Sequence, residues 1–418
     1  MIPFLLRLVF MIISPLLRKR GYKLHIGSTS WNRFKNLTLK YKTVIIKIDC
    51  IRLKRFAFGL SKDKIKFECG LNGVEVYRKE RLRASIERME ADIKFSSLQY
   101  YSVEVKFPNI KVLNLNIDKD ELYIKSVLSK QDLYNILPNN NLFHQYVNSL
   151  LAEQITILAY YNNHEVKPMP IVNYQILGLE QYDNWQPDSI SLETLILSKL
   201  KSKGHLASKY VTYDNIPYLV KATLIACEDP AFMYHTGVCP YAFGLSLKTL
   251  FDGRLPNGGG STLTQQLIKN AFFTEDISID RKVKDAITSL IAERIFHLSK
   301  HDILEIYLNM AEFGIGICGI TSASKYYFNK DISNLSPIEV LVLMYILPRP
   351  KFFEEALIND SIQLRQNLRR YILNNISRLK QMNIIDNYPP LPLADVSFPG
   401  VNASLCLDIT DWCNKDNL

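Results

Sequence analysis

Residues 258–270 read GGGSTLTQQLIKN, and this stretch decides how the second half of the chain folds. If a helix opens after the glycines, its residues divide by helical spacing into a polar and an apolar side. The polar side holds Thr262, Gln265, Gln266 and Lys269, and the apolar side holds Leu263, Leu267 and Ala271. Glycines followed by free backbone N–H groups, hydroxyls and a lysine form a cradle suited to a phosphate or pyrophosphate. The alternative is a glycine turn before a surface helix; a Walker loop is excluded because GxxxxGK[ST] is absent.

Upstream of these glycines, an apolar helical run ends at Glu228-Asp229, where Pro230 breaks the pattern. Burial at the end of an apolar helix raises the pKa of a carboxylate, which suits it to act as a base near neutral pH. The same pattern also fits an ordinary helix terminus.

Downstream, a long helix is expected to begin near Arg281-Lys282. Its apolar stripe is Val283, Ile287, Leu290, Ile291, Ile295 and Leu298. Asp285 lies off this stripe, one turn after Arg281. An i,i+4 ion pair on a solvated face explains Asp285 without any function.

Five segments together resemble the successive motifs of glycosyltransferase family 51, the peptidoglycan polymerases. They agree with the family in order and spacing over roughly Tyr210 to Phe353. The segments are EDPAFMYHTG (228–237), GGSTLTQQLIKN (259–270), RK (281–282), KHDILEIYLN (300–309) and YYFNK (326–330).

The resemblance implies an enzyme that polymerises lipid II into glycan strands, with inversion and release of a polyprenyl pyrophosphate. Glu228 would be the general base for the acceptor sugar's 4-hydroxyl, and Asp285 the second catalytic carboxylate. The resemblance implies no required cofactor; it allows a divalent cation, Mg or Mn, to assist the pyrophosphate, although no metal site is expected. The implied substrate-binding residues are Asp229, Phe232, His235, Ser261, Thr262, Gln265, Gln266, Lys269, Asn270, Arg281, Lys282 and Lys330.

Two positions depart from the family's motifs. Asp285 stands where the family carries a glutamate, and Asn329 stands in place of a glycine. The side chain of Asp285 is shorter than that of glutamate, and displacing a catalytic carboxylate by about 1 Å can cost roughly a hundredfold in rate. A non-catalytic scaffold that binds a lipid-linked glycan is therefore an alternative function. A glycan hydrolase is a third reading, against which the anion cradle argues.

The N-terminal half has a different pattern. Apolar residues alternate with polar ones from Leu37 to about Ile124, which predicts antiparallel strands. Asn72-Gly73 predicts a hairpin turn within this region. Gln131 to Tyr161 is helical in period, and His164 to Pro187 has little periodicity and reads as a domain connection.

The expected fold class is therefore α+β and multidomain, with an antiparallel β-rich domain before a mainly α, lysozyme-like glycosyltransferase domain. The expected divisions are a membrane-associated segment (1–20), a basic β-rich domain (21–130), a helical connector and linker (131–205), the catalytic domain (206–360) and a C-terminal helix with an acidic tail (361–418).

Charge is concentrated in the β-rich region. The net charge is +10, and 18 lysines and arginines stand against 9 aspartates and glutamates between Trp31 and Ile110. Such a field suits an anionic membrane or a phosphate-bearing substrate, and no nucleic-acid module is recognisable. Solvated charge on a β-domain is the alternative.

The apolar segment from Ile2 to Leu17, followed by Arg18-Lys19-Arg20, reads as a signal anchor or an interfacial segment of open topology. Val238 to Pro256 is apolar enough either to dip into a membrane leaflet or to pack in a core. The resemblance implies the bacterial inner (cytoplasmic) membrane, with the catalytic domain on its outer, periplasmic face. It also implies lipid II, the growing glycan strand and the membrane as partners, allows other cell-wall synthesis proteins as partners, and implies no nucleic acid.

Overall fold

The computed structural model describes residues 22–30, 33–41, 44–58, 65–78, 81–95, 101–107, 110–117, 121–150, 154–162, 172–177, 190–239, 260–273, 279–359, 361–385, 396–401 and 403–405. The chain forms two compact units. The first, here called the sheet unit, comprises residues 1–190, 236–261 and 273–296. The second, the helical unit, comprises residues 191–235, 262–272 and 297–418. The chain therefore passes between the units several times.

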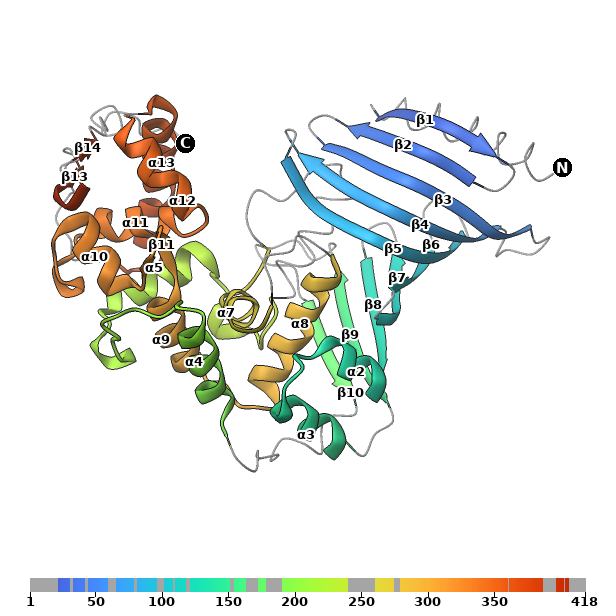
Figure 1. Ribbon diagram of the computed structural model, residues 1–418, viewed down its shortest axis with the longest axis horizontal. Helices are drawn as coiled ribbons and strands as arrows, with labels where there is room; N and C mark the ends of the chain where they lie inside the picture. Colours follow the sequence, from blue (N-terminus) through green and yellow to red (C-terminus); the bar gives the residue numbers. More distant parts are fainter. Residues whose placement is uncertain are drawn as a thin grey trace. The chain divides into compact units, whose positions relative to one another are not determined.

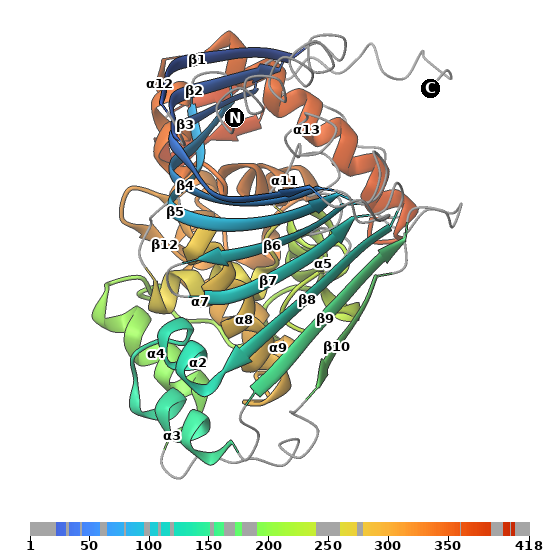
Figure 2. The same cartoon turned by 90° about the vertical axis from the view of Figure 1, so that its right-hand side faces the viewer.

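The sheet unit contains one ten-stranded antiparallel sheet whose strands follow one another in chain order (Figure 1 and Figure 2). Its strands are β1 (Tyr22–Ser30), β2 (Arg33–Tyr41), β3 (Val44–Phe58), β4 (Ile65–Arg78), β5 (Arg81–Phe95), β6 (Tyr101–Phe107), β7 (Ile110–Ile117), β8 (Glu121–Ser129), β9 (Gln154–Asn162) and β10 (Val172–Leu177). The predicted antiparallel β-rich region is thus confirmed, because period-two alternation places successive side chains on opposite faces.

The register of β1 to β3 separates an apolar face from a polar one. Ile26 pairs with Leu37, which pairs with Ile48, and Leu37 is buried. On the opposite face Lys23 pairs with Lys40, and both side chains are exposed. This end of the sheet therefore presents paired positive charges on one face.

The predicted turn at Asn72-Gly73 is wrong, because both residues lie inside strand β4. Asn72 pairs with Cys50 of β3 and with Arg88 of β5, without a register shift at that point. In the sequence, the apolar alternation moves by one position at Gly73, which imitates the end of a strand. The two long neighbouring strands hydrogen-bond β4 on both sides, and this ladder outweighs the local turn preference of Asn-Gly.

The helical prediction for Gln131 to Tyr161 is right only for its first part. Helices α2 (Lys130–Ile136) and α3 (Asn141–Ser149) form there, and Ser129 caps α2 in a capping box with Asp132. Gln154–Asn162 is instead β9, bonded between β8 and β10. The β-branched residues Ile155, Thr156 and Ile157 favour a strand when two neighbours supply the ladder.

Helix α8 (Ile279–Arg294) completes the described part of the sheet unit and contacts α2 and β5. Its predicted stripe is buried at Ile287, Leu290 and Ile291. Phe296, just after α8, packs edge-on against Phe143 and Tyr146 of α3.

The helical unit is built from short helices around an apolar core. They are α4 (Leu192–Ser202), η2 (Tyr213–Asn215), α5 (Tyr218–Glu228), η3 (Phe232–Tyr234), α7 (Leu263–Phe272), α9 (Lys300–Met310), α10 (Ile320–Phe328), η4 (Ile332–Asn334), α11 (Pro337–Ile346), α12 (Pro350–Ile358), α13 (Ile362–Gln381) and η5 (Pro399–Val401). Two small hairpins, β11 (Glu312–Gly314) with β12 (Ile317–Cys318) and β13 (Val396–Phe398) with β14 (Ala403–Leu405), accompany them.

The helix starts in this unit follow the sequence signals. Capping boxes at Ser299 with Asp302 and at Ser336 with Glu339 are both present. Helix α11 is apolar almost all round, and its residues Val340 to Met344 are buried at the centre of the unit, beside α5 and α13. The chain is thus an α+β protein with an antiparallel sheet followed by a mainly helical part.

None of the helices among the described residues is both long and apolar enough to span a membrane. The predicted membrane-associated segment, residues 1–20, lies outside the described residues, and so do residues 386–395 and 406–418 of the acidic tail.

Candidate active site

The end of helix α5 supplies the first two residues of the site. The helix is held by buried Leu219, Leu224 and Ala226, and Glu228 is its last residue. Burial raises the pKa of Glu228, a hydrogen bond from Gln266 opposes this rise, and the charge of Asp229 adds to it. The predicted direction of the shift is confirmed, with desolvation as its largest cause.

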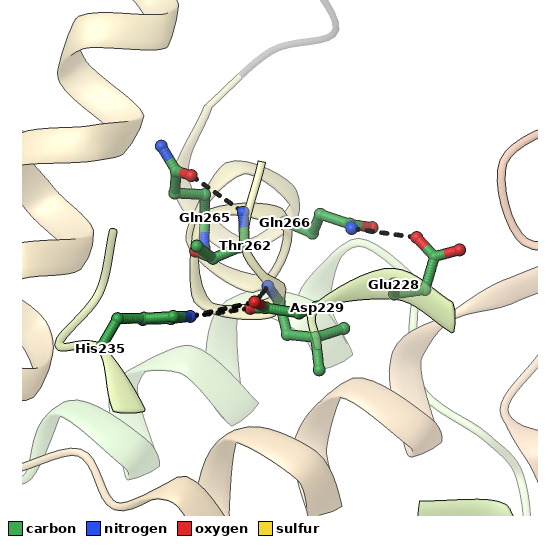
Figure 3. Close-up of polar contacts among 7 residues, drawn as sticks. Glu228, Asp229, His235, Thr262, Gln265 and Gln266 are labelled. Carbon is green, nitrogen blue, oxygen red and sulfur yellow. Dashed lines mark hydrogen bonds and ion pairs between the residues drawn. The ribbon is translucent and has the colours of Figure 1, made fainter. Parts of the chain in front are cut away.

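Asp229 ties the end of α5 to the start of α7 (Figure 3). Its side chain is only 4% exposed. The backbone N–H of Leu263, in the first turn of α7, donates to Oδ2 of Asp229 over 3.0 Å. Nε2 of His235 lies 3.1 and 3.0 Å from the two carboxylate oxygens and donates to them. A negative charge at a helix N-terminus is favourable, so Asp229 caps α7 from another segment.

Gln266 brings α7 to the carboxylate of Glu228. Its Nε2 donates to Oε2 of Glu228 over 3.4 Å, a long hydrogen bond (Figure 3). Its Oε1 accepts from the hydroxyl of Tyr307 on α9 over 2.9 Å. Tyr307 is 3% exposed. Three helices therefore converge on one carboxylate.

Thr262 and Gln265 form a capping box that the sequence analysis did not identify. The backbone N–H of Thr262 donates to Oε1 of Gln265 over 2.9 Å, and that of Gln265 donates to Oγ1 of Thr262 over 3.1 Å. The pattern S/T-x-x-E/Q is the known signal for this arrangement and is present in TLTQ. Both side chains thus serve to begin α7, whereas Ser261 is exposed.

Lys269 and Asn270 lie further along α7 and are half-buried. The side-chain amide of Asn270 lies 3.7 Å from Sδ of Met310, and its backbone oxygen accepts from Nζ of Lys203 over 2.9 Å. Asn270 therefore connects α7 to two neighbouring segments.

Phe232 is fully buried and contacts Lys300 and His235. Nζ of Lys300 lies 4.3 Å from the centre of the Phe232 ring. The ring of His235 meets Phe232 edge-on, with centroids 6.0 Å apart. A cation over an aromatic face is stabilising, which explains a lysine at the start of α9.

The remaining motif residues of α9 hold the segment before α5. Glu305 accepts from the hydroxyl of Tyr210 over 2.9 Å and from the backbone N–H of Tyr213 over 2.7 Å. The side chain of Asn309 pairs with the backbone of Val211 in both directions, over 2.8 and 2.7 Å. These contacts are structural, and no spacing rule predicts them, because they join residues more than ninety positions apart in the chain.

Arg281, Lys282 and Asp285 lie on α8, which belongs to the sheet unit. Arg281 and Asp285 form the expected i,i+4 ion pair. The expectation of a solvated face is wrong, because Asp285 is only 6% exposed. Lys282, by contrast, is exposed. Because a buried carboxylate without a partner would be costly, the ion pair with Arg281 stabilises Asp285 more than a surface ion pair would.

Lys330 and Asn329 follow α10. Nζ of Lys330 lies 2.8 and 3.1 Å from the two oxygens of Glu339, the residue that also caps α11. Asn329 ends α10 with a φ of 52°. Asparagine tolerates this left-handed conformation better than most residues, so it can replace the glycine of the family motif.

The structure describes only the first two residues of the apolar stretch Val238 to Pro256. These are Val238 and Cys239, and Cys239 is buried. Across the described residues, no group of three or more His, Cys, Asp and Glu side chains is placed to hold a metal ion.

Comparison with known proteins adds to this geometry. Residues 195–376 match the family model described as "Transglycosylase". The chain is 32% identical to the biosynthetic peptidoglycan transglycosylase of Alcanivorax borkumensis over 191 residues, which is 46% of this chain and 74% of the relative. It is 38% identical to that of Nitrosomonas eutropha over 149 residues, 36% of this chain and 60% of the relative. It is also 37% identical to penicillin-binding protein 1F of Bacillus subtilis over 167 residues, 40% of this chain but 23% of the relative.

Proposed function

The chain belongs to the peptidoglycan transglycosylase family, and from this premise we propose that Glu228 is the base with which it joins glycan units. The chain is a peptidoglycan glycosyltransferase, an enzyme of peptidoglycan biosynthesis. The observation that supports the role of Glu228 is its raised pKa at the end of a buried helix, beside the amide of Gln266. A carboxylate with a raised pKa is a better proton acceptor near neutral pH.

The reaction we assign consumes lipid II and extends a glycan strand. The acceptor's 4-oxygen forms a bond with the donor's anomeric carbon, and its proton passes to the carboxylate of Glu228. The bond between that carbon and the pyrophosphate breaks, and the electron pair leaves with the polyprenyl pyrophosphate. A single displacement of this kind inverts the anomeric centre.

The leaving pyrophosphate needs positive charge to stabilise it. We assign this role to Lys269, Arg281 and Lys282, with the exposed hydroxyl of Ser261 as a further contact. The assignment follows the order of the motifs along the chain. We assign the role of the second carboxylate to Asp285.

The buried residues of the motifs receive a different role in this proposal. Asp229, Phe232, His235 and Thr262 are nearly inaccessible, and their contacts are to protein groups. We therefore assign them to positioning α5 and α7. Lys330, paired with Glu339, and Asn270, which connects α7 to its neighbours, are assigned to the same framework. A lysozyme-like arrangement of the helical unit belongs to the proposal as well.

The proposed location is the outer face of the bacterial cytoplasmic membrane, where a lipid-linked substrate is accessible. The exposed pair Lys23 and Lys40 supports contact with an anionic surface, since like charges directly opposite in a sheet are unfavourable unless something neutralises them. Membrane anchoring by residues 1–20 and contact with other cell-wall synthesis proteins remain expectations from the sequence.

The test is polymerisation of purified lipid II by the full chain and by Glu228→Gln. Glutamine keeps the shape of the side chain but cannot take the proton, so glycan strands should fall to below a few per cent of wild type while the thermal unfolding transition is retained. A Glu228→Gln variant that polymerises at more than that level shows that the base is elsewhere. A variant of Lys351, an exposed residue on α12, to Gln is the matched control and should polymerise normally.

A further inference from the structure

A chain of hydrogen bonds reaches the carboxylate of Glu228 from inside the helical unit. The hydroxyl of Tyr307 donates to Oε1 of Gln266 over 2.9 Å, and Nε2 of Gln266 donates to Oε2 of Glu228 over 3.4 Å. We propose that Tyr307 is a positioning residue that holds the Gln266 amide with its donor end toward Glu228 and thereby keeps the base ionised and aimed. This inference rests on the proposed function of Glu228.

The amide of Gln266 has two different ends, an acceptor oxygen and a donor NH2 group. Burial and the charge of Glu228 raise the pKa of Tyr307 well above its ordinary value, so its hydroxyl keeps its proton and is available as a donor. A donor at this position selects the amide oxygen. The NH2 group must then face the carboxylate, because rotating the amide by 180° would place oxygen against an anionic oxygen.

The hydrogen bond from Gln266 changes the proton affinity of the base. Burial raises the pKa of Glu228, and the amide lowers it by stabilising the ionised form. The amide therefore keeps Glu228 unprotonated at a lower pH than burial alone would allow. Without Tyr307, the amide is free to rotate and gives this stabilisation for only part of the time.

The other titratable groups near Glu228 do not account for the acid limb of the pH profile. Asp229 on the neighbouring position raises the pKa of Glu228. Burial raises the pKa of Cys227 to about 11 and raises that of Tyr371 on α13 well above its ordinary value, so both are neutral at neutral pH. Arg378 of α13 is positive and donates to the backbone oxygen of Ala226 over 2.7 Å. The acid limb of the activity is thus assigned to Glu228.

The experiment is the pH dependence of kcat/KM for lipid II polymerisation by the full chain and two variants. Gln266→Met removes the amide at similar length and should move the acid limb to higher pH by about one unit, whatever its effect on the maximal rate. Tyr307→Phe removes one oxygen atom and should move the limb in the same direction by a smaller amount. This second variant preserves the packing of α9 and keeps the test usable if Gln266→Met does not fold.

Tyr327→Phe is the matched control. Tyr327, a residue of α10, is also fully buried, but its hydroxyl donates to the backbone oxygen of Phe313 over 2.7 Å. It should lower the unfolding temperature and leave the pH profile in place. An acid limb that stays in place for Tyr307→Phe, even with a slower rate, overturns the positioning role, whether or not Gln266→Met moves it. Wild-type enzyme without polymerase activity, or an active Glu228→Gln, overturns the proposed function itself, so the two failures are distinct.

Discussion

The carboxylate of Asp229 accepts the backbone N–H of Leu263 over 3.0 Å, although the two residues belong to different motifs. This bond fixes where α7 begins relative to the end of α5. Gln266 lies one turn further along α7, so its distance from Glu228 depends on the bond. The two neighbouring carboxylates therefore have different contacts, since Gln266 on α7 donates to Glu228 and Asp229 caps the start of α7.

We expect Asp229→Ala to destabilise the protein and reduce activity together. The change removes a buried carboxylate and leaves the N–H of Leu263 and Nε2 of His235 without this acceptor, a loss of about 2 to 3 kcal/mol in the free energy of unfolding. Urea unfolding measures it directly. Asp331→Ala, at an exposed residue whose side chain does not cap η4, is the control and should change stability by less than about 0.5 kcal/mol. Equal effects of the two changes contradict the capping role.

Local signals in the sequence were reliable where the neighbouring residues alone determine the structure. The boxes at Ser299 and Ser336 involve residues three positions apart, and both form as predicted. The same pattern at Thr262 was overlooked because the preceding glycines suggested anion binding instead. The Asn72-Gly73 turn failed because the strands on either side of β4, which come from other parts of the sequence, determine its length.

The residues of the site were foreseen as chemical types but not as contacts. The apolar run before Glu228 predicts a buried carboxylate with a raised pKa, and burial indeed raises the pKa of Glu228. Tyr307 has no pattern that distinguishes it from the other buried residues of α9, such as Ile306 and Leu308, since its contact is with Gln266, which is remote in sequence. The burial of Asp285 was missed for the same reason, because the surroundings of α8 come from distant segments.

Two substitutions of Asp285 separate the effect of its carboxylate on activity from an effect on the structure of helix α8. Asp285→Glu restores the family's longer side chain and should preserve or raise polymerase activity, whereas Asp285→Ala should lower it strongly. Initial rates of lipid II polymerisation measure both. Alanine and glutamate are each at least as helix-favouring as aspartate, so loss of the helix does not explain the result.

The alanine variant also removes an ion-pair partner of Arg281. Thermal unfolding should therefore be recorded beside the rates, and activity should be compared below the transition of both variants. An alanine variant as active as wild type shows that the carboxylate of Asp285 serves the structure of α8 and not the reaction.

Two glycines with nearly equal backbone angles give a matched pair. Gly237 has a φ of +68° and Gly204 a φ of +70°. A Cβ atom at Gly237 would lie 2.4 Å from the backbone oxygen of Ser289, whereas no atom lies within 4 Å of a Cβ at Gly204. Gly204→Ala should cost about 1 to 2 kcal/mol from the left-handed backbone alone. Gly237→Ala should cost at least about 2 kcal/mol more, because the backbone of α8 cannot move aside like a flexible side chain. Similar urea midpoints for the two variants contradict this close approach.

The last prediction concerns the exposed pair Lys23 and Lys40 on the polar face of the sheet. Each lysine near an anionic membrane contributes about 1 kcal/mol, so replacing both by glutamine should weaken binding of the full chain to phosphatidylglycerol vesicles by about thirtyfold at low salt. Sedimentation with vesicles measures the partition. Because the field decays over about 8 Å at physiological salt, added salt should remove most of the difference, and vesicles of phosphatidylcholine alone should show none. Lys351→Gln with Lys380→Gln, two exposed lysines of the helical unit, makes the same change in net charge and should weaken binding much less. If the two double variants bind alike, net charge and not the face of β1 and β2 governs the association.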